Sequence, residues 1–212
     1  MTTGEQTTGE QAQGVAPWPR VAQSLRELDS LDQAAYHAVA ATASPTLDTG
    51  LRWLSSVADH SKLWLVIAGV LALRGGRSRR AALLGVASVG LASATVNIAG
   101  KRLLSRARPD RAGARVPPAR LVPMPRSGSF PSGHAASAFA FAAAVGSELP
   151  PLSFPLHLLA TGVAYSRVHT GVHYPADVVF GSLAGTAAAA AVRYGVALKG
   201  SSSPGRSRAR TR

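Results

Sequence analysis

Three short segments of the chain combine cationic, imidazole and carboxylate side chains. They read KRLLSRARP (101–109), PSGH (131–134) and SRVHTGVHYPAD (166–177). A phosphoryl group is held by cations and amide donors around its non-bridging oxygens. Its transfer also needs an in-line nucleophile and an acid that protonates the leaving oxygen. The three segments contain all of these groups, so together they indicate chemistry on a phosphoryl group.

The spacing of the first two segments suits an anion site. Lys101 and Arg108 are seven residues apart, which on a helix places both on one side about two turns apart, and Pro109 ends the run. In the second segment Ser132 can cap a helix and Gly133 allows close approach of the backbone. The first N–H groups of a helix lack partners and attract anions.

The remaining groups are two imidazoles, a third cation and a carboxylate. His134 closes the second segment, and in the third segment Arg167 precedes His173 while Asp177 follows His173 by four residues. Two histidines from different loops fit an acid and a nucleophile. Asp177 would fix the tautomer of an attacking histidine and stabilise its positive charge, as the carboxylate of a serine-protease triad does.

These segments lie between long apolar stretches. Residues 81–99 and 176–198 are each close to the roughly 20 residues that cross a bilayer. Shorter apolar runs cover 61–73, 134–149 and 152–166. Small residues dominate these runs, which suits close packing of helices in lipid. The sequence therefore predicts an all-α integral-membrane bundle of about six helices.

The composition agrees with a membrane protein. Of 212 residues, 46% are hydrophobic and only 16% are charged, against about a quarter charged in soluble domains. We expect a disordered segment at 1–17, a membrane domain at 18–198 and a basic disordered tail at 199–212. The net charge of +13 is attributed to loops that face anionic lipid headgroups rather than to nucleic-acid binding.

The order of the helices predicts where the polar segments meet. Membrane helices joined by short connections run antiparallel, so the end of 81–99 and the start of 134–149 should share one membrane face. Two crossings later, the end of 154–166 and the start of 176–198 return to that face. The three polar segments should therefore converge into one site at a single surface of the bilayer.

The combined pattern, Lys-x6-Arg-Pro, then Pro-Ser-Gly-His, then Ser-Arg-x5-His-x3-Asp, resembles the type 2 phosphatidic acid phosphatase family. This family is related to the vanadium haloperoxidases, and its six-helix membrane core is similar to the helix layout from about residue 50 to 198. The resemblance implies a lipid phosphate phosphatase that needs neither a metal nor another cofactor and works through a phosphohistidine intermediate.

The resemblance also implies a role for each motif residue. His173 is the expected nucleophile, Asp177 orients it, and His134 protonates the leaving group. The residues expected to bind phosphate are Lys101, Arg108, Ser132, Gly133 and Arg167.

The substrate and the oligomeric state stay open at this point. Polyprenyl phosphates and diphosphates, phosphatidic acid, phosphatidylglycerol phosphate and a phosphorylated polyprenyl sugar all fit a lipid phosphatase. Two other functions fit the same scaffold, namely a vanadate-dependent haloperoxidase and a non-catalytic protein that binds or transports lipid. The long apolar stretches argue against the haloperoxidase, because those enzymes are usually soluble.

Positively charged segments of membrane proteins tend to lie in the cytoplasm, so the basic turn at 74–80 and the basic tail are expected on the cytoplasmic side of the plasma membrane. The protein is then multi-pass with an outward-facing site. Among neighbouring residues, Arg106 is expected to be interfacial and His169 to be a wall of the site. The spacing of His169 and His173 would suit a metal on a helix, but Gly171 and Pro175 argue against a continuous helix there, so no metal site is expected. Asp59 has no role in this interpretation.

Overall fold

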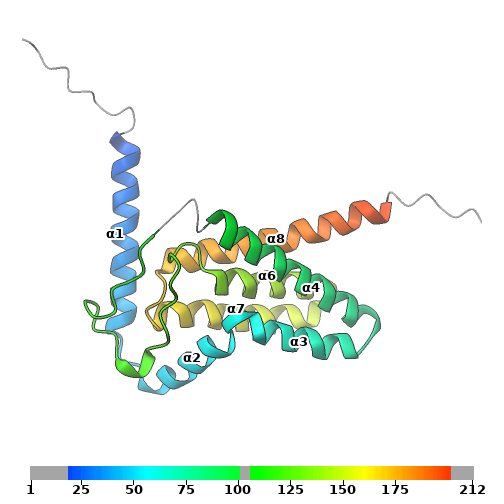
Figure 1. Cartoon of the computed structure of the whole chain (residues 1–212), viewed down its shortest axis with the longest axis horizontal. Helices are drawn as coiled ribbons and strands as arrows, with labels where there is room; N and C mark the ends of the chain where they lie inside the picture. The colour runs from blue at the N-terminus through cyan, green and yellow to red at the C-terminus, as the bar shows by residue number, and fades with distance from the viewer. Residues whose placement is uncertain (1–18, 101–105, 202–212) are drawn as a thin grey trace, which may run out of the picture.

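The computed structural model describes residues 19–100 and 106–201, which are all-helical or irregular with no strand. Figure 1 shows a bundle of helices with α1 standing at one end, transverse to most of the others. The α-helices are α1 (Pro19–Ala41), α2 (Pro45–Val57), α3 (Lys62–Leu73), α4 (Gly76–Ala94), α6 (Gly133–Glu148), α7 (Pro150–His169) and α8 (Pro175–Ser201). The shorter helical turns are η1 (Asp59–Ser61), the π-helical η2 (Thr95–Gly100) and η3 (Pro118–Arg120). The predicted all-α bundle is confirmed.

Within residues 19–100 and 106–201, two helical stretches are long and apolar enough to cross a membrane, Gly76–Ile98 and Pro175–Lys199. Both were predicted from the sequence. The pair α2 and α3 forms a further candidate crossing, which is bent by 61° where the two helices meet. At 16 residues, α6 is shorter than a usual crossing, which suits a helix enclosed by its neighbours.

The centre of the bundle is α6, which packs against α4, α7 and α8. Its buried side chains are mostly alanines, so the backbones of neighbouring helices come close. The contact with α8 is the tightest. A Cβ atom at Gly181 would strike the carbonyl oxygen of Ser132, and one at Gly185 would strike that of Ala136. Glycine is therefore required at both positions of α8.

The polar segments meet at one end of the bundle, as the helix order predicted. Figure 1 shows α7 ending, and α6 and α8 beginning, at the same end. The backbone N–H of Ser132 donates to the carbonyl oxygen of Asp177 at 2.9 Å, which ties the start of α6 to the start of α8. Motif residues separated by more than forty positions in the chain are thus adjacent.

Some helix boundaries differ from the predicted ones. Residues 106–110 have no regular secondary structure, because Arg108 precedes a proline and such residues disfavour the helical conformation. The predicted helix 154–166 is longer, since α7 begins at Pro150, where a missing N–H costs nothing. The predicted segment 1–17, most of the tail 199–212 and Lys101 lie outside the described residues.

The α6–α8 contact predicts a specific sensitivity to added volume. Gly185→Ala should lower the melting temperature of the detergent-solubilised protein, because overpacking costs about 1–3 kcal/mol. Gly90→Ala on α4 is the matched control, since nothing lies within 4 Å of that position. There the better helix propensity of alanine should leave stability equal or slightly higher. Equal melting of Gly185→Ala and the parent protein would contradict the close contact.

Candidate active site

His173 and Asp177 form a pair where the α7–α8 turn enters α8. The His173 side chain is buried, and its Nδ1 lies 3.4 Å from Oδ2 of Asp177. The same carboxylate oxygen accepts a hydrogen bond from the backbone N–H of Tyr174 at 2.8 Å. The carboxylate therefore faces Nδ1, and the other ring nitrogen, Nε2, is turned toward Arg108.

Arg108 places a fixed positive charge beside this imidazole. Its Nη1 lies 3.4 Å from Nε2 of His173. Three backbone carbonyl oxygens accept hydrogen bonds from the guanidinium, at 2.6 Å for Val172, 2.9 Å for Ser127 and 3.1 Å for Gly128. Carbonyl groups orient the guanidinium without neutralising it, so its charge remains available to an anion.

Burial sets the protonation state of His173. Desolvation is the main cause that lowers the pKa of its imidazole to about 4, and Arg108 and Arg167 act in the same direction, while Asp177 acts in the opposite one. The imidazole is consequently neutral at pH 7 and keeps a lone pair on one ring nitrogen. A neutral imidazole oriented by a carboxylate can act as a nucleophile or as a base.

The PSGH segment begins α6 as the sequence predicted. Ser132 is the N-cap residue, and its Oγ accepts a hydrogen bond from the N–H of Ala135 at 3.4 Å. Ser132 is fully buried, whereas Gly133 and His134 line a cavity. The start of α6 thus brings helix N–H groups, which attract anions, to the edge of that cavity.

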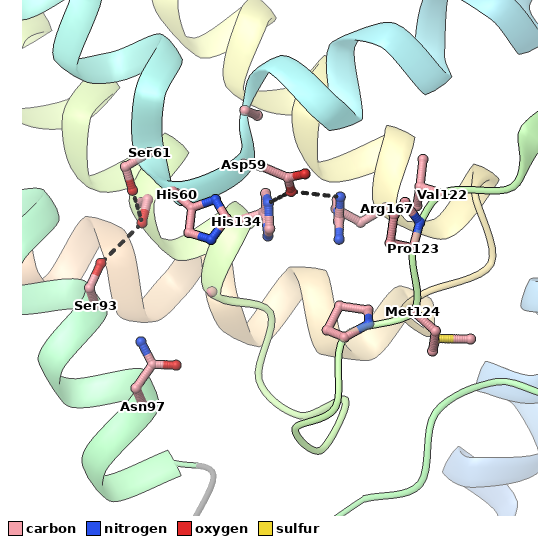
Figure 2. A pocket seen from close by; sticks show the side chains of 14 residues that line it. Asp59, His60, Ser61, Ser93, Asn97, Val122, Pro123, Met124, His134 and Arg167 are labelled. Carbon is pink, nitrogen blue, oxygen red and sulfur yellow. Dashed lines mark hydrogen bonds and ion pairs between the residues drawn. The ribbon is translucent and has the colours of Figure 1, made fainter.

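Asp59 joins two of the predicted residues, and the sequence analysis missed it. Its Oδ1 lies 2.7 Å from Nε2 of His134 and 3.7 Å from Nη1 of Arg167 (Figure 2). Arg167 is itself buried and donates to Oγ of Ser55 at 2.5 Å. The available signal was the position of Asp59 between two apolar helices, since ionisable residues inside membrane segments are usually functional.

Arg106 is not interfacial, which corrects the expectation from the sequence. Its guanidinium lies 3.1 Å from Oδ1 of Asp177, 2.7 Å from Oδ2 of Asp32 and 2.6 Å from Oδ1 of Asp29. It also lies over the ring of Tyr174, 4.0 Å from its centre. Carboxylates from α1 and α8 thus share one cation, which holds Asp177 in place behind His173.

His169 is not a wall of the site, which is a second correction. It is buried, and its Nε2 lies 2.9 Å from Oδ1 of Asp48, an atom that also accepts from Nε of Arg120 at 2.8 Å. This cluster fastens the loop before α6 to α2. The described residues contain no group of three His, Cys, Asp or Glu side chains that could hold a metal.

A cavity of about 440 Å³ opens beside the start of α6. Figure 2 shows His134 and Arg167 at its upper side below Asp59, with Asn97 on the opposite wall. The lining residues are Ala58, Asp59, His60, Ser61, Ser93, Asn97, Val122, Pro123, Met124, Pro125, Gly133, His134, Ser137 and Arg167.

Arg167 connects this cavity to the nucleophile side. It lowers the pKa of His173 and approaches Asp59, the partner of His134. The structure therefore brings together all of the predicted site residues that it describes, while Lys101 lies outside the described residues. Two arginines, a helix N-terminus and two imidazoles surround one region, and such an arrangement can bind a phosphoryl group and transfer it.

Comparison with known proteins adds a family and named relatives. Residues 81–200 match the family model of the PAP2 superfamily. The chain is 37% identical over 141 residues to decaprenylphosphoryl-5-phosphoribose phosphatase of Mycobacterium tuberculosis. The aligned region covers 66% of this chain and 76% of that relative. It is 38% identical over 137 residues to the phosphatase of the same name from Mycolicibacterium smegmatis, covering 65% and 72%.

Two solved structures share the fold. LpxE of Aquifex aeolicus superposes with a TM-score of 0.63 and 23% identity, over 77% of this chain and 95% of that protein. A transmembrane PAP2-type phosphatidylglycerolphosphate phosphatase of Bacillus subtilis superposes with a TM-score of 0.64 and 23% identity, over 84% and 90%. At this identity the likeness concerns the arrangement of the helices.

The environment of His173 predicts its titration. In an NMR pH titration of histidine-labelled protein, the His173 imidazole should titrate near pH 4, far below free histidine at about 6.5. Arg108→Gln removes a cation 3.4 Å from the ring, so the pKa of His173 should rise by about 1 pH unit.

Arg126→Gln serves as the matched control, because Arg126 is an exposed arginine of the same loop. It should leave the titration of His173 unchanged. A His173 midpoint near 6.5 in the parent protein would contradict the buried, cation-flanked position described above.

Proposed function

This chain belongs to the PAP2 superfamily, and we propose that it removes the phosphate of a sugar phosphate carried on a polyprenyl lipid. It is a phosphoric-ester hydrolase acting on a membrane lipid phosphate, as its family and its named relatives are. The proposal adds the residues that perform the reaction, the leaving group and the side of the membrane.

The observation that carries the residue assignment is the neutral, buried His173 between Asp177 and Arg108. In the proposed reaction Nε2 of His173 forms a bond to phosphorus while the bond from phosphorus to the leaving oxygen breaks. His134 donates a proton to that oxygen, and the alcohol leaves. Asp177 stabilises the positive charge on the phosphorylated imidazole.

The second half-reaction releases the phosphate. A water molecule attacks the phosphorus, His134 takes its proton, and the bond between phosphorus and Nε2 breaks, which restores the neutral imidazole. The non-bridging oxygens are held by Arg108, Arg167 and the N–H groups at Gly133, with Lys101 as a further cation from the first motif. These groups supply the positive charge that a phosphoryl transition state needs, so no metal takes part in the proposal.

The leaving group is inferred from the relatives. Two proteins at 37% and 38% identity carry the name decaprenylphosphoryl-5-phosphoribose phosphatase, so we take a polyprenyl-linked phosphorylated pentose as the favoured substrate. Phosphatidic acid, phosphatidylglycerol phosphate and polyprenyl diphosphate are the lipids against which it should be compared.

The site is proposed to face outward from the plasma membrane. Arg77 and Arg79 open α4 at the end opposite the site, and the neighbouring Arg80 forms an ion pair with Glu148 at 3.3 Å. Basic residues at the site end are largely engaged inside the protein, Arg106 and Arg120 with carboxylates and Arg108 with carbonyls. Free positive charge therefore favours a cytoplasmic position for the α3–α4 turn.

The nucleophile assignment predicts a specific loss of activity. His173→Ala should reduce phosphate release from the polyprenyl-linked sugar phosphate by at least about 1,000-fold, because the covalent half-reaction is lost. His37→Ala, an exposed histidine of α1, is the matched control and should retain full turnover.

Both proteins should be assayed in detergent micelles with a chelator present. Unchanged turnover in His173→Ala would refute the nucleophile, and complete dependence on added divalent metal would refute the metal-free reaction. Halide oxidation by peroxide with added vanadate would instead identify a haloperoxidase.

The orientation predicts a labelling pattern that the cysteine-free chain makes easy to measure. Ala119→Cys at the site end and Ser78→Cys in the first turn of α4 introduce one thiol each without changing charge. A membrane-impermeant maleimide applied to intact cells should label Ala119→Cys only. Ser78→Cys should react after permeabilisation, and the reverse pattern would place the site in the cytoplasm.

A further inference from the structure

The cavity beside His134 has a polar wall that the proposed phosphate chemistry does not use. Ser137 follows His134 by one helical turn on α6, and its hydroxyl lies 3.3 Å from that of Ser61 and 3.3 Å from that of Ser93. These three serines come from α6, η1 and α4 and line the same cavity, as Asn97 does. Figure 2 shows the serine contacts and Asn97 below them.

The three hydroxyls differ from several other helical hydroxyls of the protein, which bond to the backbone of their own helix. Ser88, Thr95 and Ser182 each donate to the carbonyl oxygen four residues earlier, at 2.7, 2.9 and 2.7 Å. That is the ordinary way in which a helix satisfies a serine or threonine. Ser93 and Ser137 instead turn toward each other, at a distance longer than the usual 2.7–2.8 Å of a hydroxyl pair. In a pair held this loosely, a hydroxyl group of a ligand can replace one serine as the hydrogen-bond partner of the other.

Asn97 adds a second type of group to this wall. It lies in the π-helical turn η2, and such turns are frequent at functional sites. Its side chain is exposed at the cavity, and within residues 19–100 and 106–201 it has no hydrogen-bond partner. A carboxamide has both donors and an acceptor, so it can bind a hydroxyl group that donates or one that accepts a hydrogen bond.

On the side away from Asp59, His134 and Arg167, these groups adjoin an apolar core. Ala92, Val96, Ala136 and Ala140 form this core together with Ala188 of α8, and Ala92 and Ala136 directly precede Ser93 and Ser137 in the sequence. Polar side chains inside a membrane bundle are costly and usually have a function. The cluster is uncharged, so it matches neither a second phosphate nor a cation, and it matches neutral hydroxyl groups.

We propose that Ser61, Ser93, Ser137 and Asn97 form a subsite that binds the hydroxyls of a sugar leaving group. The inference rests on the proposed function, because it places the sugar on the side from which His134 protonates the leaving oxygen. A volume of about 440 Å³ lies within the usual 300–1,000 Å³ of small-molecule pockets. A diacylglycerol leaving group would set methylene groups against the same hydroxyls and offer them no hydrogen bond.

The test compares two lipids that differ in the leaving group. Ser137→Ala, Asn97→Ala and the double variant are assayed with a synthetic polyprenyl-phosphoryl-5-phosphoribose and with phosphatidic acid, both in mixed micelles. Each lost hydrogen bond should lower kcat/KM for the sugar lipid about fivefold, and the double variant about 20-fold. The kcat/KM for phosphatidic acid should change by less than about twofold.

Ser88→Ala is the matched control, because Ser88 is buried on α4 and bonds its own backbone. It should leave the ratio of the two kcat/KM values unchanged. Asn97 is exposed, so its variant remains informative if Ser137→Ala lowers stability. Equal losses on both lipids would overturn the subsite and leave the phosphatase intact. A parent protein that releases no phosphate from either lipid would overturn the proposed function.

Discussion

The hydrogen bond from the Ser132 N–H to the Asp177 carbonyl oxygen joins the start of α6 to the start of α8. It forms because Gly181, in the second turn of α8, places no side chain against Ser132. A side chain at Gly181 would separate the helix N–H groups of α6 from His173, so a single phosphoryl group could no longer contact both. The catalytic geometry therefore depends on the close approach of the α6 and α8 backbones, which positions the side chains that carry the chemistry.

Ion pairs between the first 60 residues and the rest of the chain also hold the site in place. Seven of the ten carboxylates precede residue 60, and 20 of the 23 lysines and arginines follow it. Four of these carboxylates meet basic groups from the later part, namely Asp29 and Asp32 with Arg106, Asp48 with Arg120, and Asp59 with His134. The uneven charge along the sequence thus becomes a set of ion pairs in the fold. Buried charges that lack a partner are costly, so these pairs hold the site loop against α1 and α2.

The motif residues and the main helices were predictable because their signals are local. The PSGH segment predicts the start of a helix, and the long apolar stretches predict the membrane-crossing helices α4 and α8. The roles of Asp59 and Arg106 were not predictable, because each depends on partners more than 70 residues away in the sequence, and no short pattern encodes such a spacing. His169 was misassigned for the same reason, because its hydrogen-bond partner in the interior, Asp48, is also distant in the sequence. The absence of a helix at Arg108 could have been predicted from the following proline.

The charge pairs between the two halves also bear on what counts as the minimal enzyme. The family match begins at residue 81, and every motif residue lies beyond that point. A fragment cut there would keep the whole signature and yet lose the carboxylates that α1, α2 and η1 supply to Arg106, Arg120 and His134. Arg106 would retain only Asp177 of α8. The amino-terminal third is therefore an integral scaffold of the catalytic centre, even though it carries none of the signature by which the family is recognised.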